Sequence, residues 1–297
     1  MNRLLKCILS LICVFGLLVM ASPCFAVSAV ASETDDKVIV SEYEYITSIR
    51  AMSDSELEAA ALSESEIQMI RSNVIEDEIL ARKQLSDAVL MEKYGYTYED
   101  ISILREYDGE RLENNAELAA ITGTLTISRP IVTIVTTTTI GVRVMWSWDH
   151  CPLMCATDVF AIYWEPSFGS QSGNMRIIIP NSSHTVTYNF YNTYFNRNWN
   201  ITQVSPTSSA KSLFGMQDQT GEGWAEHGTL ELYFEATAGS AALTEIDFIF
   251  AYGHTVLSAS PSVSFPDGGG ISFGFTTDEA DTYSGYINVR TTKWYDN

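Results

Sequence analysis

The sequence has little positive charge. Its 297 residues include 17 lysines and arginines against 37 aspartates and glutamates, and the formal net charge is −20. Because phosphate groups repel a surface of this sign, nucleic acid is excluded as an electrostatic partner and anionic lipid is disfavoured. The acidity itself predicts no partner, since an acidic surface commonly serves solubility alone.

The sequence also lacks the short motifs that mark a reaction. It contains no G-x-S-x-G nucleophile elbow and no H-E-x-x-H zinc motif. The glycine run Gly268–Gly270 is not followed by the Lys-Ser/Thr of a phosphate-binding loop, so a hairpin turn is the simpler interpretation. We therefore predict no cofactor and select no catalytic residue.

Only one stretch of the chain is continuously hydrophobic. Two basic residues precede the apolar run Ile8–Met20, which is shorter than the roughly 20 residues that cross a bilayer. Small residues around Ala26 complete the pattern of a secretory signal peptide. We predict cleavage after residues 1–26, a mature chain of net charge −22 that begins at Val27, and an extracellular location. An uncleaved membrane anchor is the alternative.

Cysteine is scarce in the predicted mature chain, which keeps only Cys151 and Cys155. A cysteine pair in an exported protein favours a disulfide, and Pro152 between the two favours the tight loop that such a bridge closes. Free thiols are one alternative. A zinc site is the other, built on the pair with His150 and a ligand from elsewhere: His184, His227, His254 or an acidic side chain. No ligand spacing selects that site, so we predict no metal.

Composition changes near residue 118. Residues 27–118 hold 22 acidic and 8 basic residues with apolar residues at helical spacing, whereas the rest is rich in threonine, serine, glycine and aromatic residues. We predict a flexible linker over 27–41, an acidic helical region over 42–118 and a β-domain over 119–297. The helical region is expected to act as an adaptor or mask for the β-domain, or as a bundle that aids export or folding.

The helical region carries a weak internal repeat. Residues that start predicted helices recur after 33 or 34 positions: Ser53 and Ser86, and Ser63 and Thr97. Ser53, Ser63 and Thr97 each precede an acidic residue by three positions, the pattern of a helix-capping box. We predict two helix-pair repeats, with a further helix from about Glu76 to Gln84 between them.

Apolar and polar residues alternate in the β-domain, which is the period of half-buried strands. We predict one long strand whose buried face holds Ile134, Thr136, Thr138, Ile140, Val142, Val144, Trp146 and Trp148. Shorter runs bring the total to roughly nine to eleven strands, and a helix is predicted at Ser209–Asp218. The fold class is α+β: a small acidic helical segment followed by an all-β antiparallel sandwich, Ig-like or jelly-roll-like, with a barrel as the alternative.

The segment Tyr188–Asn200 interleaves six aromatic residues with asparagines. Such rings stack on sugars or lie at lipid interfaces, so the candidates for ligand or lipid contact are Tyr188, Tyr191, Tyr194 and Trp199. The segment resembles an aromatic stretch of the actinoporin family of pore-forming toxins over a dozen residues, which implies membrane contact. That family, however, is basic and has no acidic helical segment. Packing of these rings in the sandwich core is the other interpretation.

Together these patterns favour a secreted, non-enzymatic protein that binds an extracellular glycan or surface protein. A membrane-active, β-pore-forming-like protein is the alternative, supported by the aromatic segment and by the threonine-rich run Ile131–Ile140. A secreted hydrolase ranks third. Its candidate carboxylate pairs are Glu231 with Glu235 and Glu245 with Asp247, which the alternation places on the solvent face of strands.

Overall fold

The structure is a computed structural model that describes residues 37–59, 64–136, 138–168, 172–255, 262–264, 272–274 and 280–290. The predicted signal peptide with its cleavage site, the predicted capping residue Ser63 and the run Gly268–Gly270 lie outside these residues.

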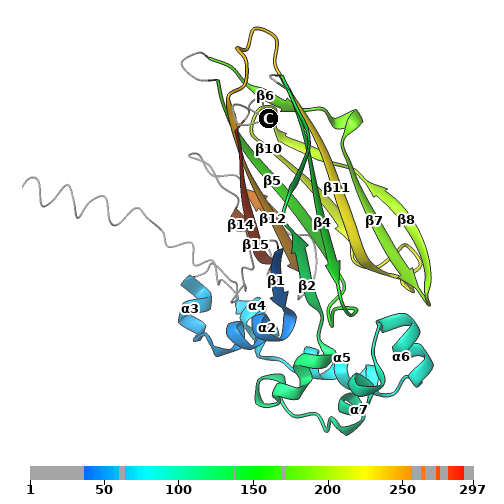
Figure 1. Cartoon of the computed structure of the whole chain (residues 1–297). Coiled ribbons are helices and arrows are strands. Elements are labelled where there is room, and N and C mark those ends of the chain that lie inside the picture. The colour runs from blue at the N-terminus through cyan, green and yellow to red at the C-terminus, as the bar shows by residue number, and fades with distance from the viewer. Residues whose placement is uncertain are drawn as a thin grey trace, which may run out of the picture.

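Two antiparallel sheets form the β-sandwich (Figure 1). The eight-stranded sheet has the order β1-β2-β4-β11-β7-β8, with β3 paired to β4 and β6 paired to β11. Its strands are β1 (Lys37–Ser41), β2 (Thr124–Ser128), β3 (Ile131–Val135), β4 (Thr139–Trp148), β6 (Met175–Ile177), β7 (Ser183–Phe190), β8 (Thr193–Trp199) and β11 (Trp224–Ala236). The predicted antiparallel sandwich is confirmed.

The five-stranded sheet has the order β15-β12-β5-β10-β9. Its strands are β5 (Thr157–Ser167), β9 (Thr202–Ser205), β10 (Ser209–Gly215), β12 (Glu245–Thr255) and β15 (Ala280–Arg290). A separate pair is formed by β13 (Ser262–Ser264) and β14 (Ser272–Gly274), and a 3-10 turn, η3 (Ile179–Asn181), precedes β7.

Aromatic side chains fill the core between the sheets. The ring of Trp146 stacks on Phe214 at 5.1 Å and meets Tyr252 edge-on at 5.4 Å between centroids. Gly228 lies opposite Trp146, and a Cβ atom there would come within 2.5 Å of the indole ring. The glycine therefore makes room for a tryptophan that is 2% exposed and that contributes a large buried apolar area.

The prediction of one long strand is correct only for its second half. From Ile140 to Trp148 the alternate residues are buried as expected, but the preceding residues form a separate strand, β3, that pairs back onto β4. The turn forms at Thr136, whose backbone N–H donates to Thr139 O and whose hydroxyl accepts from the amides of Thr138 and Thr139. Local side-chain bonding of this kind favours a turn over a continuous strand.

The helix predicted at Ser209–Asp218 is wrong, because Ser209–Gly215 is strand β10. Backbone partners on both sides, β5 and β9, complete its hydrogen bonds. Ala210, Ser212 and Phe214 face the core in alternation, which is the period of a strand. A seven-residue run is too short for periodicity alone to separate the two structures.

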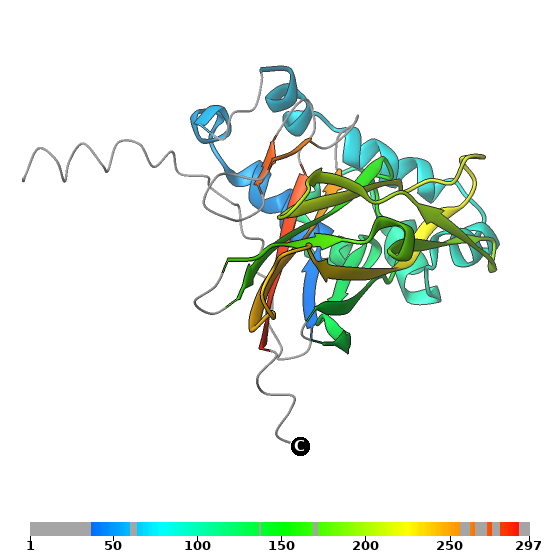
Figure 2. The ribbon, with the colours of Figure 1, turned by 90° about the horizontal axis from the view of Figure 1, so that it is seen from above.

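The helices gather at one end of the sandwich (Figures 1 and 2). They are α2 (Glu42–Ala51), α3 (Asp54–Ala59), α4 (Glu64–Arg71), α5 (Val74–Lys83), α6 (Asp87–Tyr94) and α7 (Tyr98–Glu106), followed by the 3-10 turns η1 (Leu112–Asn114) and η2 (Ala116–Ile121). Residues 37–41, which we assigned to a flexible linker, instead form β1 and pair with β2.

Local capping explains where the helices begin. The Thr97 hydroxyl accepts from the Asp100 amide while the Asp100 carboxylate accepts from the Thr97 amide, as the capping box predicts. Ser53 and Glu56 make the same exchange at the start of α3. Ser86 caps α6 through the amide of Val89.

Helices lie where the repeat predicts them: α3 with α4 and α6 with α7 are the two pairs, and α5 is the further helix between them. Equivalent contacts extend each unit to three helices, with α2 added to the first and α5 to the second. At the end of α4, the Arg71 guanidinium donates to the carbonyls of Arg50 and Met52 and to Asp54. At the end of α7, Arg105 makes the equivalent bonds to the carbonyls of Lys83 and Leu85 and to Asp87. In each unit the third helix thus holds the C-terminus of the first helix and the N-terminus of the second.

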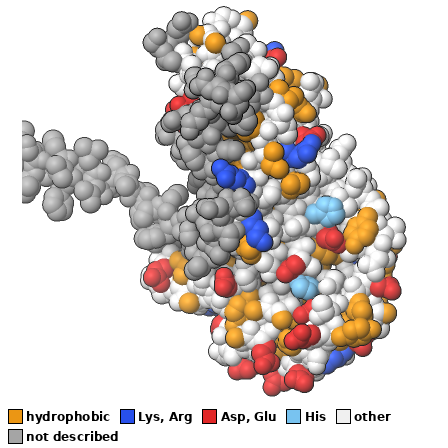
Figure 3. All heavy atoms as spheres, viewed as in Figure 1, with side chains coloured by type: hydrophobic (Ala, Val, Ile, Leu, Met, Phe, Trp, Pro, Cys, Tyr) orange, Lys and Arg blue, Asp and Glu red, His pale blue; other side chains and the backbone are white. Residues whose placement is uncertain are grey.

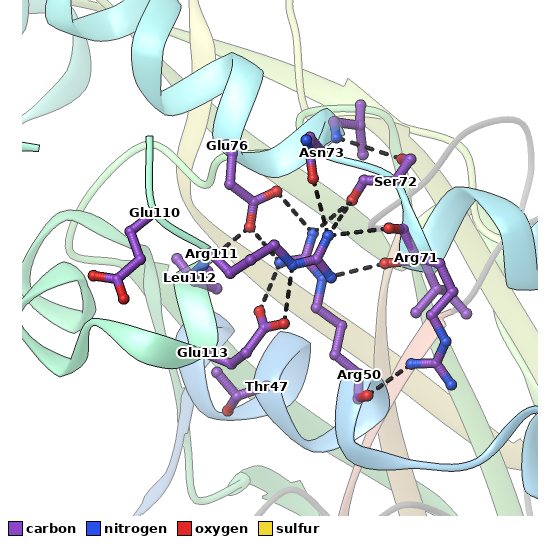
Figure 4. A network of polar contacts seen from close by, with 12 residues as sticks. Thr47, Arg50, Arg71, Ser72, Asn73, Glu76, Glu110, Arg111, Leu112 and Glu113 are labelled. Atoms are coloured by element: carbon purple, nitrogen blue, oxygen red, sulfur yellow. Dashed lines mark hydrogen bonds and ion pairs between the residues drawn. The ribbon is translucent and has the colours of Figure 1, made fainter. Parts of the chain in front are cut away.

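Arg50 and Arg82 both lie in the last turn of their helices, α2 and α5, and their partners differ. Arg50 remains within the helical region, where its guanidinium binds Glu76 and Glu113 and the carbonyl of Ser72 (Figure 4). Both carboxyl groups are partly buried, which alone would raise their pKa values; bonds to Arg50 and neighbouring groups hold the pKa of Glu76 and of Glu113 below the usual value. Arg82 instead reaches the sandwich.

Candidate functional site

The aromatic segment forms the β7–β8 hairpin. Its turn residues, Tyr191 and Asn192, both have positive φ angles, 48° and 58°, as a two-residue turn between twisted strands requires. Asparagine tolerates this conformation, whereas for tyrosine it costs roughly 1–2 kcal/mol. The Tyr191 ring is 37% exposed, lies against Phe190 and stands 6.0 Å from the Lys93 ammonium of α6.

The four aromatic candidates are divided between the two faces of this hairpin. Tyr188 is fully buried, and its hydroxyl donates to Gly215 O and accepts from the Trp199 indole. Trp199 faces the same way and is only partly exposed, with the Arg197 guanidinium 4.1 Å from its ring. Tyr194 lies on the outer face with 51% of its surface exposed. Tyr188 is therefore a core residue, and Tyr191 and Tyr194 are the accessible rings.

The outer face of the eight-stranded sheet carries a row of polar side chains that we call the polar row. The strand register places its members side by side across five strands: Thr126, Ser147, His227, Thr187 and Asn196. Thr187 donates to the Asn196 carbonyl oxygen at 2.8 Å, and Thr185 makes the same bond to Asn198 in the next row. In Figure 1 the helices lie beyond the ends of the strands and cover neither face of the sheet.

Charge is unevenly distributed over this side of the molecule. Figure 3 shows acidic side chains gathered at the helical end and mostly uncharged side chains over the sheet. The predicted carboxylates Glu231 and Glu235 are each bound by an arginine of a neighbouring strand, Arg143 and Arg176 respectively. In these cross-strand ion pairs each arginine binds one oxygen, Oε1, of its glutamate, which gives the carboxylate a structural role.

The Cys151–Cys155 loop connects the helical region to the sandwich. Arg82 donates to the carbonyls of Cys151 and Pro152, and Glu42 of α2 accepts from the amides of Leu153 and Met154. The two Sγ atoms are 3.5 Å apart and unbonded, so the predicted disulfide stays a prediction.

The histidines of the zinc alternative lie elsewhere. His150 faces Asp100 and Asp149 at 3.2 and 3.1 Å; burial alone would lower its pKa, but these carboxylates raise it. His184 accepts from the Trp146 indole inside the core, where burial lowers its pKa to about 3. In the part of the chain that the structure describes, no three histidine, cysteine or acidic side chains are placed to hold a metal.

His254 belongs to a buried charged cluster that the sequence did not reveal. Its Nδ1 lies 3.0 Å from both Asp158 carboxylate oxygens, and its Nε2 lies 3.8 Å from Glu42. Burial alone would lower its pKa, but the Asp158 and Glu42 carboxylates raise the pKa to about 10. Glu42 also accepts from the Gly123 amide, so one carboxylate joins α2, the Cys151–Cys155 loop and the sandwich.

A cavity of about 260 Å³ opens between α6 and the sandwich, and we call it the junction cavity. Both cysteines line it, together with Tyr94, Lys93, Glu222 and Trp224. The Trp224 indole donates to Lys93 O and the Cys151 amide donates to Tyr94 O, which fixes α6 against the sandwich. The cavity lies near the hairpin, because the Lys93 ammonium stands 5.5 Å from the Tyr94 ring and 6.0 Å from the Tyr191 ring.

Comparisons with known proteins give little further guidance. No protein-family model matches the chain, and no curated protein matches it. Among solved structures, ACE19, the collagen-binding subdomain of the Enterococcus faecalis surface protein ACE, matches with a TM-score of 0.28 and 7% identity over 54% of this chain and 94% of that chain. Clostridium perfringens delta-toxin matches with a TM-score of 0.24 and 5% identity over 58% of this chain and 86% of that one.

A structure described as a pore-forming protein also matches, with a TM-score of 0.24 and 7% identity over 56% of this chain and 84% of that chain. These descriptions correspond to the binding and membrane functions that the sequence left open, but TM-scores this low do not choose between them. Among the described residues, no helix combines the length and the apolar character needed to cross a membrane.

Proposed function

We propose that the protein is exported and binds a neutral extracellular polysaccharide along the polar row, with Tyr194 as a stacking platform. The observation that carries this proposal is the run of hydrogen-bonding side chains across five neighbouring strands, of which Ser147, His227 and Asn196 are exposed and the two threonines partly exposed. Sugar hydroxyls both donate and accept, and the row offers hydroxyl, imidazole and amide groups that match them.

The dimensions of the row suit an extended chain. Four strand spacings of about 4.8 Å give a length of about 19 Å. Thr187 and Thr185 bind only the side-chain oxygens of Asn196 and Asn198. The NH₂ groups of these two asparagines have no protein partner within the described residues. The side chain of His227 is 47% exposed and Tyr194 is 51% exposed. A sugar chain on this face would therefore meet hydrogen-bond donors and an aromatic ring together.

Tyr191 adds a second, independent argument. A residue held at positive φ persists where the structure around it compensates, and such residues gather at binding sites. Tyr191 keeps an exposed ring in a turn position that asparagine or glycine would occupy at lower cost. We therefore include Tyr191 in the proposed contact surface, at the end of the hairpin that carries Tyr194.

The proposal is tested by affinity electrophoresis on gels that contain a soluble polysaccharide. Xylan, β-glucan and mannan are the first probes. The unmodified protein is expected to be retarded by at least one of them. Tyr194→Ala and His227→Ala should each weaken binding about threefold to tenfold, because each removes a contact worth roughly 0.7–1.4 kcal/mol. Tyr98→Ala, which removes a 75% exposed tyrosine from α7, is the matched control and should bind unchanged. Equal loss in all three variants would contradict the proposed surface.

Membrane contact is a second candidate, and exposed isoleucines on β3 favour it. Ile131 is 48% and Ile134 is 40% exposed on a strand that pairs, among the described residues, only with β4. If this hairpin inserts into bilayers, the protein should release dye from neutral vesicles, and Ile131→Ser with Ile134→Ser should reduce release at least fivefold. The two substitutions remove little buried apolar surface and leave the fold intact, because both isoleucine side chains face solvent. No release from the unmodified protein at any lipid composition would exclude this candidate.

A further inference from the structure

The junction cavity brings a pair of thiols to a space that a small molecule can enter. Cys151 is buried at 4% exposure and Cys155 is partly exposed, and both line the cavity of about 260 Å³. This volume lies below the roughly 300–1,000 Å³ of pockets for drug-sized ligands, so the cavity holds a small disulfide such as cystine whole, or one half of a larger disulfide whose other half stays outside. A cysteine pair that served only as a structural bridge would need no such opening.

The loop holds the two sulfur atoms ready to form a bond. A disulfide has an S–S length of about 2.05 Å, so the atoms need to approach by roughly 1.5 Å from their separation of 3.5 Å. The surrounding loop is fixed from both sides, by Arg82 on its carbonyls and by Glu42 on its amides. Closure therefore requires side-chain movement and little rearrangement of the backbone.

The charges around the pair favour one thiolate. Burial alone would raise the pKa of the Cys151 thiol, but its hydrogen bond with Cys155 and the positive charge of Arg82 hold the pKa below the usual value. The same interaction with Cys151, together with burial, raises the pKa of Cys155 well above the usual value. The Cys155 thiol also donates to the Pro152 carbonyl at 3.5 Å, so Cys155 is the residue that keeps its proton. Because the thiolate is the nucleophile in disulfide chemistry, we assign the attack to Cys151 and the resolving step to Cys155.

The other charges in the lining indicate the chemistry of the ligand. Glu78 is already paired with Arg82 at 2.9 Å. Lys93 and Glu222 have no ion-pair partner among the described residues, so the cavity presents one ammonium and one carboxylate to a ligand. Tyr94 and Trp224 supply aromatic walls. This combination is complementary to a zwitterion that carries both a carboxylate and an ammonium group.

We propose that the junction cavity is a thiol–disulfide exchange site for low-molecular-weight disulfides built from amino acids, such as cystine or glutathione disulfide. The Cys151 thiolate attacks one sulfur of R–S–S–R, forming Cys151–S–S–R and releasing R–S⁻. Cys155, on losing its proton, attacks the Cys151 sulfur, forming the Cys151–Cys155 disulfide and releasing the second R–S⁻. The two protons of the original thiols end on the two R–SH products, and the two cysteines lose the two electrons that the small disulfide gains.

The test uses the whole protein without its predicted signal (residues 27–297), reduced and freed of reductant, with glutathione disulfide as the probe. We expect two glutathione molecules released per chain and a protein mass that falls by the two hydrogens of the thiols. Cys155→Ser should release one glutathione and retain one glutathionyl group on Cys151. Cys151→Ser should react at least about tenfold more slowly, because it lacks the thiolate that Arg82 stabilises.

Lys93→Met separates recognition from simple thiol reactivity. It should slow the reaction with glutathione disulfide about threefold, the scale of an exposed ion pair, and leave the reaction with uncharged bis(2-hydroxyethyl) disulfide unchanged. Two results would overturn the proposal. One is a rate with glutathione disulfide no faster than that of the urea-unfolded protein. The other is a Cys151–Cys155 bond that stays closed at every ratio of reduced to oxidised glutathione, which would make it a structural bridge only.

Discussion

Replacing Arg82 with methionine is expected to lower the free energy of unfolding by about 3–5 kcal/mol. The side chain is 2% exposed, and its guanidinium donates to Glu78, to the Tyr96 hydroxyl and to the carbonyls of Cys151 and Pro152. Methionine fills much of the same volume but donates to none of these acceptors, and the Pro152 carbonyl keeps only the weak Cys155 thiol donor. Since the last two belong to the sandwich, the helical region loses one of its polar attachments there, and the bonds of Glu42 remain.

Urea denaturation under reducing conditions measures this effect with the cysteines in one state. Arg176→Met is the matched control, because Arg176 is 60% exposed and binds Glu235 on the sheet surface. An exposed pair of this kind contributes less than about 1 kcal/mol, so the control should unfold close to the unmodified protein. Equal midpoints for Arg82→Met and Arg176→Met would show that Arg82 does not hold the two regions together.

Local patterns in the sequence predicted the parts of this fold that depend on neighbours along the chain. The capping box of Thr97 and Asp100 and the buried alternation from Ile140 to Trp148 both depend on residues a few positions apart. Where the partner lies far away, the prediction failed. Residues 37–41 carry only a short β-branched run, Val38–Val40, and β1 forms because β2, more than eighty residues later, supplies its hydrogen bonds. Strand β10 likewise depends on β5 and β9.

The same distinction between local and distant partners applies to the candidate site. Aromatic richness located the hairpin, but only the register showed that Tyr188 turns inward and Tyr194 outward, since a shift of one residue would reverse the two. Arg82 and Glu42 meet the Cys151–Cys155 loop across 69 and 111 residues, and no local pattern reports such a contact. One feature was visible in the sequence: the repeat spacing of 33 residues pairs Arg50 with Lys83, so Arg82 lies one position away from the basic residue that the alignment selects, and the repeat does not report its buried contacts.

Raising the pH from 6.5 to 10 is expected to destabilise the protein through His254. Its pKa is about 10 in the folded state and near the ordinary 6.5 in the unfolded chain. Between these values the folded state binds more protons than the unfolded state, so the free energy of unfolding falls as the pH rises, by up to about 1.4 kcal/mol per pH unit. The stabilisation is complete below pH 6.5 and is lost as the pH passes 10.

His254→Gln isolates this contribution, because glutamine can still donate to Asp158 but does not titrate. The groups that face His254 are Asp158 on β5 and Glu42 on α2, with Tyr252 bound to the same Asp158 carboxylate. The depressed pKa of Cys151 acts in the opposite direction over part of this range, so both proteins are compared in a Cys151→Ser, Cys155→Ser background. Urea unfolding at pH 6.5, 8 and 9.5 should give a steep decline with His254 and a much flatter one with glutamine. Parallel declines would mean that His254 is not the charged centre joining α2 to the sandwich.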